Sequence, residues 1–222
     1  CYFTENHDEQ RLASGFVFSS ARQGFLATAV AALSGGNPLL LYFGQELGEQ
    51  GMDTEGFSGR DGRTTIFDYW SLDTLRRRCH GGRYDEALLT DAERSLLHQY
   101  TAILRLSREE KALAEGTFFD LMYVNPASDS FDPARQYAYL RKADEVVVLV
   151  AVNFADTPRR VRIRIPEAAF RSMSIPDNTP ARLTDLLTGT VAIGTLTHAC
   201  AYEVELPPCS GRLLKFDYSG LS

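Results

Sequence analysis

The segment that decides the fold is FTENHDEQR, residues 3–11 of a chain of 222 residues. Directly after a short apolar strand end it places an amide, an imidazole and a carboxylate side by side, on Asn6, His7 and Asp8. A lone histidine would be weak evidence, but three different polar groups together at the end of a strand favour a binding or catalytic site. The simpler alternative is an aspartate that caps a helix beside a histidine that bonds within the protein.

A helix and a second strand follow this segment in the sequence. Ser20, with Gln23 three positions later, fits a capping box, and apolar residues recur at helical spacing until Gly35. This pattern predicts a helix over residues 20–34. The run PLLLYF, residues 38–43, is continuously apolar, which is typical of a strand buried on both faces of a parallel sheet. The start of the chain therefore reads as a strand-helix-strand unit.

Two motifs resemble the α-amylase family of glycoside hydrolases, family thirteen. The pattern F-x-x-N-H-D of residues 3–8, followed by Gln10 and Arg11, is similar to the family's fourth sequence region, which ends the seventh strand of a (β/α)8 barrel. The segment GQELG, residues 44–48, resembles the family's G-x-E at the end of the eighth strand. Because their order and the helix between them also agree, the pair is stronger evidence than either motif alone.

The resemblance implies a role for each polar residue of these motifs. Asp8 would be the family's third carboxylate, a transition-state stabiliser that binds sugar hydroxyls next to the scissile bond. His7 would hydrogen-bond the same sugar, Asn6 would organise the loop and the ligand, and Arg11 would be a charge partner nearby. Glu46 should approach the same mouth, since the active sites of such barrels lie at the C-terminal ends of the strands.

The resemblance also implies that this chain is the C-terminal portion of an amylase-like enzyme. A retaining glycosidase needs a nucleophile and an acid/base about 5–5.5 Å apart, and in this family those two residues sit on the fourth and fifth strands, which would lie before Cys1. We expect residues 1–115 to form the last two βα units of a TIM barrel and residues 116–222 to form an all-β domain. This piece by itself is expected to be inactive.

One segment has the residue spacing of the family's nucleophile region. GGRYD, residues 81–85, has the G-x-R-x-D spacing of that region but follows the basic run of residues 76–78 and lies downstream of the N-H-D motif. We therefore do not expect Asp85 to be a nucleophile. The basic run itself is interpreted as a solvated face or as local pairing with carboxylates.

Residues 51–84 show no clear periodicity and predict a long loop. Loops of this length in compact domains are usually functional or disordered. Tyr69 and Trp70 are candidates for stacking on sugar rings at the barrel mouth. The same rings could instead pin the loop to the barrel.

The rest of the chain changes from a helical to an alternating pattern. TDAE, residues 90–93, is a second capping box and begins an amphipathic helix predicted over residues 91–109. Alternation of apolar and polar residues then predicts an antiparallel β-sandwich. Its predicted strands cover residues 136–141, 145–153, 160–165, 201–206 and 212–218.

Composition excludes several classes of function. The net charge of −6 and the isoelectric point near 5.3 argue against a nucleic-acid-binding surface, and no apolar run is long enough to span a membrane. Four irregularly spaced cysteines match no zinc motif and are interpreted as free thiols, with a bridge between Cys200 and Cys209 as the alternative. No cofactor is expected. The resemblance implies that calcium is possible in the full-length enzyme, in an inserted domain that often binds it, but this piece gives no support for calcium. The sequence does not decide the cellular compartment.

The resulting hypothesis is a fragment of a retaining α-glucan hydrolase or transglycosylase, acting on starch or maltodextrin. Two alternatives are a non-catalytic carbohydrate-binding or assembly module and an amylase-like pseudoenzyme without catalytic strands. Two strands of a barrel would expose an edge on each side. The expected partners are therefore an α-glucan oligosaccharide or polysaccharide and either the N-terminal barrel half or a second copy of this chain.

Overall fold

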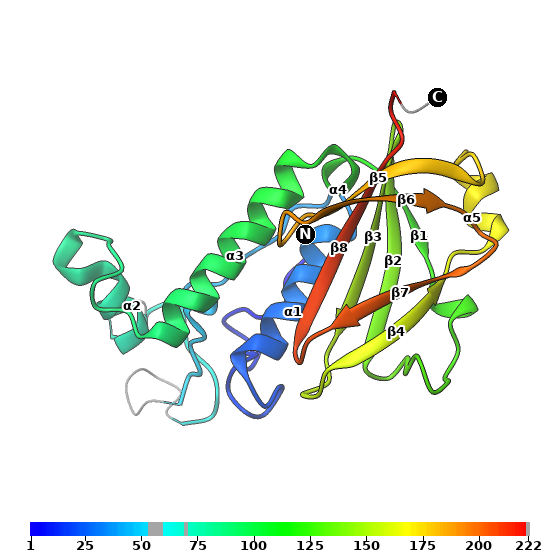
Figure 1. Cartoon of the computed structure of the whole chain (residues 1–222). Coiled ribbons are helices and arrows are strands. Elements are labelled where there is room, and N and C mark those ends of the chain that lie inside the picture. The colour runs from blue at the N-terminus through cyan, green and yellow to red at the C-terminus, as the bar shows by residue number, and fades with distance from the viewer. Residues whose placement is uncertain (53–59, 69–70, 221–222) are drawn as a thin grey trace. The chain divides into compact units, whose positions relative to one another are not determined.

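The computed structural model describes residues 1–52, 60–68 and 71–220 and divides the chain into two compact units (Figure 1). The first unit contains residues 1–33 and 37–105. The second contains residues 34–36 and the chain from residue 106 onward. No helix among the described residues combines the length and the apolar character needed to cross a membrane.

The first unit is built from helices. Its helical elements are α1 (Ala21–Leu33), η1 (Gln45–Leu47), α2 (Asp73–Cys79), η2 (His80–Gly82) and α3 (Asp91–Glu109), whose last residues fall in the second unit. The helices predicted over residues 20–34 and 91–109 are confirmed.

Helix α2 corrects the prediction of an unstructured loop over residues 51–84. Asp73 lies in its first turn and three arginines lie in its last turn, which is the charge distribution that the helix dipole favours. A helix of only seven residues produces little periodicity, so the sequence pattern did not reveal it. The basic run forms local ion pairs: Arg76 with Asp73 at 3.2 Å and Arg77 with Glu93 at 2.5 Å.

Helix α1 begins at the predicted cap and packs through a glycine. The Ser20 hydroxyl accepts a hydrogen bond from the Gln23 backbone N–H at 3.4 Å, and the Gln23 side chain accepts one from the Ser19 hydroxyl at 2.6 Å. A Cβ atom on Gly24 would lie 2.7 Å from the Leu12 Cβ, so only glycine lets the segment after residue 11 lie this close to the helix. The Phe25 ring meets the Tyr100 ring of α3 edge-on at 5.0 Å.

The strand predicted over residues 38–43 is reduced to one parallel bridge, between Tyr2 and Leu39. The Tyr2 N–H donates to the Pro38 carbonyl at 2.7 Å, and the Leu40 N–H donates to the Tyr2 carbonyl at 2.8 Å. The parallel direction agrees with the predicted strand-helix-strand unit. A pair of strands without further neighbours is only marginally stable, which explains why no longer ladder forms.

The cap of α3 joins this helix to α2. The Thr90 N–H donates to the Glu93 carboxylate at 2.8 Å, and the Glu93 N–H donates to the Thr90 hydroxyl at 3.2 Å, which confirms the second capping box. Arg77 donates to the same carboxylate through Nε and Nη2. Burial alone would raise the pKa of Glu93, but the hydrogen bonds from Arg77 and Thr90 outweigh it and leave this pKa lowered.

The second unit consists of two antiparallel sheets (Figure 1). A six-stranded sheet has the order β1-β2-β3-β8-β5-β6, and β4 pairs with β7 in a two-stranded sheet. The strands are β1 (Thr117–Asp120), β2 (Gln136–Ala143), β3 (Val146–Asn153), β4 (Arg159–Arg164), β5 (Thr179–Asp185), β6 (Val191–Leu196), β7 (Ala201–Leu206) and β8 (Ser210–Asp217). The helical elements are α4 (Lys111–Ala114), η3 (Met122–Val124) and α5 (Glu167–Ser172).

All five predicted strands are present, as β2, β3, β4, β7 and β8, whereas β1, β5 and β6 were not predicted. The alternation on β4 is the clearest case, because Val161 and Ile163 are buried while the arginines between them are exposed. Apolar residues of both sheets belong to one hydrophobic core, which includes Leu140 of β2, Leu149 of β3 and Val204 of β7.

A buried arginine connects the sheet with the short segments grouped into this unit. Arg141 of β2 is 2% exposed. Its guanidinium donates to the Ala112 carbonyl at 3.2 Å, the Leu113 carbonyl at 2.9 Å and the Ser34 carbonyl at 2.6 Å. The bonds to Ala112 and Leu113 satisfy carbonyls at the end of α4 that the helix itself leaves without partners.

We expect Leu149→Ala to lower the free energy of unfolding of the second unit by about 2–5 kcal/mol, because Leu149 is fully buried in the shared core. Ile193→Ala is the matched control: this side chain is 75% exposed, so its loss should change stability by less than about 0.5 kcal/mol. Urea unfolding followed by circular dichroism measures both. Equal effects of the two substitutions would contradict the proposed core.

The cap of α3 generates a prediction about pH. Because the folded-state pKa of Glu93 is lowered, its ionised form stabilises the fold above the ordinary value of 4.5, and this contribution disappears as the pH falls below it. Glu93→Gln should therefore cost about 1.5–3 kcal/mol at neutral pH and progressively less at lower pH. Unfolding of the parent and the variant between pH 7 and pH 3 measures this difference. A difference that does not change with pH would contradict the assigned role.

Candidate functional site

The loop of residues 6–8 presents two polar side chains to solvent. The Asn6 side-chain oxygen accepts hydrogen bonds from the backbone N–H groups of Asp8 at 2.8 Å and Glu9 at 3.0 Å, so Asn6 shapes the turn. The side chains of His7 and Asp8 are 55% and 75% exposed. His7 Nε2 lies 3.4 Å from Asp8 Oδ2. The imidazole and the carboxylate are thus adjacent, accessible and held on one turn.

A buried ion pair joins the two ends of this loop. Glu5 is 1% exposed and Arg11 is 0% exposed, and Arg11 Nη1 donates to Glu5 Oε1 at 2.7 Å. The second carboxylate oxygen of Glu5 accepts the Leu12 backbone N–H at 2.7 Å. The two partners flank residues 6–10, so their pairing fixes the distance between the two ends of the loop. The sequence analysis did not single out Glu5, although an acidic residue next to the motif and six positions from an arginine was a usable signal.

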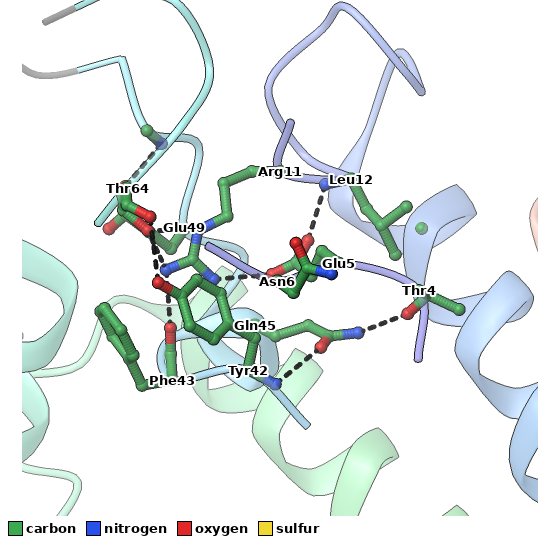
Figure 2. Close-up of polar contacts among 12 residues, drawn as sticks. Thr4, Glu5, Asn6, Arg11, Leu12, Tyr42, Phe43, Gln45, Glu49 and Thr64 are labelled. Carbon is green, nitrogen blue, oxygen red and sulfur yellow. Dashed lines mark hydrogen bonds and ion pairs between the residues drawn. The ribbon is translucent and has the colours of Figure 1, made fainter. Parts of the chain in front are cut away.

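The Arg11 guanidinium also reaches two other segments of the first unit (Figure 2). Its Nε donates to the Thr64 hydroxyl at 2.9 Å, and its Nη2 donates to the same hydroxyl at 2.6 Å and to the Phe43 carbonyl at 2.8 Å. The Arg11 backbone N–H donates to the Gly62 carbonyl at 2.6 Å. One side chain therefore joins the N-terminal loop, the end of the apolar run and the segment around residue 64.

Aromatic rings enclose the cation. The Arg11 Cζ atom lies 4.3 Å from the centroid of the Tyr42 ring and 5.1 Å from that of the Phe43 ring. The Tyr42 hydroxyl donates to the Thr64 carbonyl at 3.0 Å. Arg11 is fully buried, and for a desolvated cation such a cation–π contact contributes about 2 kcal/mol. This enclosure is consistent with a rigid support for the loop rather than with a group that reaches solvent.

Burial dominates the electrostatics of the pair. Desolvation raises the pKa of the Glu5 carboxyl, and the charge and hydrogen bond of Arg11 offset this only in part, so that the pKa stays raised. The nearby Glu49 charge acts in the same direction as burial. Ion pairs of this kind cost desolvation free energy when they form, but losing one partner costs more, because a buried charge is then left uncompensated.

Gln45, in the segment GQELG, forms hydrogen bonds next to the start of the loop. Its Nε2 donates to the hydroxyls of Thr4 at 2.9 Å and Thr28 at 2.8 Å, and its Oε1 accepts the Tyr42 N–H at 3.1 Å. Residue 4 is thereby tied to the end of the apolar run (Figure 2). The contacts of Thr28 with Thr4 and Gln45 also tie it to α1. Tyr100 lies within 3.4 Å of the same amide, and burial raises the pKa of its phenol to about 12.

Glu46 and Glu49 differ in their surroundings. Glu46 is half-buried, and desolvation raises the pKa of its carboxyl, while the charges of Arg11 and Arg78 oppose that shift. Glu49 is buried and accepts hydrogen bonds from the Gly51 N–H at 2.7 Å and from the Thr74 hydroxyl. Glu49, which the sequence analysis did not single out, thus attaches the chain after η1 to α2.

The other sequence candidates fall outside this arrangement. Tyr69 and Trp70 lie outside the described residues. Asp85 is paired with His80, whose Nδ1 lies 2.7 Å from Asp85 Oδ1, and it accepts the Ala87 N–H at 3.1 Å. This is a local surface turn.

Metal ligands and disulfides do not organise the described part of the chain. No group of three or more His, Cys, Asp or Glu residues among these residues could hold a metal ion. All four cysteines, at positions 1, 79, 200 and 209, are free thiols.

The fold is similar to that of solved α-amylases and a related enzyme, although no protein-family model and no curated protein matches the sequence. AmyP in complex with maltose superimposes with a TM-score of 0.61 at 16% identity over 96% of this chain and 40% of AmyP. The α-amylase of Geobacillus thermoleovorans, complexed with acarbose, gives 0.60 at 17% identity over 98% of this chain and 38% of the enzyme. A mutant of trehalulose synthase MutB gives 0.54 at 20% identity over 97% and 43%.

These similarities establish the fold. Helices followed by antiparallel sheets match the C-terminal region of α-amylases. The chain spans about two fifths of the length of the solved structures it matches.

We expect Arg11→Met to lower the free energy of unfolding of the first unit by about 3–5 kcal/mol, since it leaves the buried Glu5 carboxylate uncompensated. The double variant Glu5→Gln/Arg11→Met should lose less than the sum of the two single variants, because the two side chains contact each other. Guanidinium unfolding, monitored by far-ultraviolet circular dichroism, measures these values.

Arg76→Met is the matched control. It removes an arginine from an exposed pair with Asp73, whose side chains are 53% and 65% exposed, and should cost less than about 1 kcal/mol. An Arg11→Met variant as stable as this control would contradict the role given to the buried pair.

Proposed function

We propose that this chain is the C-terminal part of an α-amylase-family glycoside hydrolase or transglycosylase that acts on α-glucans with retention of configuration. Residues 1–115 would complete the last two βα units of its (β/α)8 barrel, and residues 116–222 would form its all-β domain. The observation that carries the proposal is the exposed pair His7 and Asp8, on a turn whose base is braced by the buried Glu5–Arg11 ion pair.

The exposed carboxylate suits the chemistry of glycoside cleavage. The transition state resembles an oxocarbenium ion, so a fixed negative charge nearby stabilises it more than it stabilises the neutral substrate. Asp8 would supply that charge and accept hydrogen bonds from sugar hydroxyls. His7, 3.4 Å away, would bind a hydroxyl of the same sugar. The nucleophile and the acid/base would come from the remainder of the polypeptide.

The other candidate residues receive different roles. Arg11 would act by positioning the loop, because its side chain is fully buried and donates to three protein groups. Glu46, half-buried near the Arg11 charge, would support the end of the eighth strand. Tyr69 and Trp70 stay candidates for stacking on a sugar.

Exposed apolar side chains support the view that the chain works within a larger barrel. Tyr2, Phe3 and Leu40 are 37%, 52% and 42% exposed, and they lie at or beside the parallel bridge between residues 2 and 39. Unpaired strand edges with apolar side chains favour association. Neighbouring barrel strands would cover them, and so could a second copy of this chain.

A carbohydrate-binding module is the second candidate, favoured by one observation. Tyr123 in the second unit is 63% exposed and offers a ring on which a sugar could stack. Phe118 in the same unit is also 41% exposed, but Phe131, Tyr139 and Phe216 are buried. Two exposed rings are weaker support than the loop of residues 6–8.

The experiment is an assay of the native polypeptide that carries this sequence, on starch and maltodextrins. We expect Asp8→Asn to lower kcat by at least about a hundredfold, because the amide retains the shape of the carboxylate but not its charge. Asp85→Asn is the matched control, being another exposed aspartate beside a histidine, and should leave kcat unchanged. Measuring kcat and KM separately distinguishes lost transition-state stabilisation from lost binding.

Two results would overturn the proposal. If the native polypeptide has the 24.7 kDa mass of this chain and no activity, the enzyme assignment fails and the binding module or pseudoenzyme remains. If Asp8→Asn is as active as Asp85→Asn, the role of the loop fails.

A further inference from the structure

We propose that Arg162 and Arg164, on the exposed face of β4, form a binding site for the phosphate group of a small molecule. The site lies within the second unit and uses none of the residues assigned to glucan chemistry. It would therefore exist whether or not the proposed function is correct.

Strand periodicity places the arginines together. On β4 the side chains of Arg160, Arg162 and Arg164 are exposed, while those of Val161 and Ile163 are 1% and 0% exposed in the core. The core therefore fixes the side of the sheet on which the three cations stand. Adjacent outward positions on one strand lie two residues apart, close enough for two guanidinium groups to reach one anion.

Cross-strand pairing leaves one of these cations without an acidic partner. In the register of β4 with β7, Arg160 faces Glu205 and Arg162 faces Glu203, with N–O distances of 2.5 Å and 3.9 Å. Arg164 faces Ala201 instead. Among the described residues Arg164 forms no ion pair with a carboxylate. On the outward face of this ladder, two acidic residues thus stand opposite three arginines.

The small side chain of Ala201 leaves space beside the two arginines. Two hollows, of about 360 Å³ and 320 Å³, are both bordered by Arg162, Arg164 and Ala201. Each is at the lower end of the range of about 300–1,000 Å³ that is typical of small-molecule sites. The space accommodates more than a bare anion, so the ligand could be a phosphate ester such as a sugar phosphate.

One hollow is also lined by hydroxyl groups on a loop that is attached to β4. Ser128 and Ser130 line it, with their hydroxyl oxygens 3.4 Å apart. The Arg164 N–H donates to the Asn125 side-chain oxygen at 2.8 Å, and the Asn125 amide donates back to the Arg164 carbonyl at 3.0 Å. The Arg162 N–H donates to the Ser130 carbonyl at 3.3 Å. These bonds hold the hydroxyls in place before a ligand arrives, which lowers the entropic cost of binding.

Two acidic residues lie near the site and do not neutralise it. Glu203 is 3.9 Å from Arg162, at the limit of an ion pair, and both side chains are about 60% exposed. Asp177 is engaged by His198, which lines the second hollow: it accepts the His198 N–H at 3.0 Å and lies 3.2 Å from His198 Nε2. Guanidinium groups bind phosphate oxygens through paired N–H donors. Two of them with nearby hydroxyls match a phosphate dianion better than a neutral glucan.

The test is a calorimetric titration of this chain at low ionic strength. The ligands are inorganic phosphate and glucose 6-phosphate, and glucose is the neutral control. We expect saturable binding of both phosphates and none of glucose. Arg164→Ala should weaken binding by about tenfold or more, because hydrogen bonds to a charged group contribute at least that much. Arg160→Ala, which removes an arginine already paired with Glu205, should weaken it less than about twofold.

Ala201→Glu is the most informative variant, because it completes the ladder without removing an arginine. A glutamate at this position would face Arg164 as Glu203 faces Arg162, so the fold should keep its melting temperature while phosphate binding is lost. Tighter binding of glucose 6-phosphate than of inorganic phosphate would support a sugar phosphate as ligand, and equal binding would support free phosphate. Non-saturable binding, or equal affinity of the parent and Ala201→Glu, would overturn the proposal.

Discussion

The first unit depends on one buried cation. Arg11 is fully enclosed by protein, and its guanidinium binds the Glu5 carboxylate, the Thr64 hydroxyl and the Phe43 carbonyl. These groups come from three separate segments, so none of them can move without leaving a buried charge or a buried polar group unsatisfied, at a cost of several kcal/mol. The contacts of Arg11 also fix the backbone of the exposed turn of residues 6–8. His7 and Asp8 can stay accessible and still keep a fixed position, because the rigidity resides in residues that a ligand never needs to touch.

The second unit is held together by a different constraint, which is apolar burial on alternate residues. Both sheets contribute to one core, so the arginines and glutamates of β4 and β7 must stand outside it in register. Surface ion pairs of this kind contribute little to stability. Their arrangement nevertheless has a consequence for binding: where Ala201 interrupts the acidic row, Arg164 remains available beside two hollows. Stability and the proposed anion site thus come from opposite faces of the same strand.

The sequence predicted elements with strong local signals and missed those set by distant contacts. The capping boxes at residues 20 and 90 located the starts of α1 and α3 to within a residue, and alternation located β4 and β7. Strand β5 contains Pro180, which argues against a strand, yet it pairs with β6 and β8. The three motif residues were recognisable because their types are unusual together. Glu5 was overlooked although its partner Arg11 lies only six positions away, whereas Glu49 could not be found, because its partner Thr74 is 25 positions away and no local pattern reveals the contact.

The central claim is that the turn of residues 6–8 contacts a glucan while the buried pair behind it does not. A crystal structure of the native polypeptide with a bound maltooligosaccharide tests this most directly. The account predicts sugar hydroxyls within hydrogen-bond distance of Asp8 and His7, and unchanged contacts between Arg11 and Glu5. A sugar bound elsewhere with this turn unoccupied, or one that draws Arg11 away from Glu5, would contradict it.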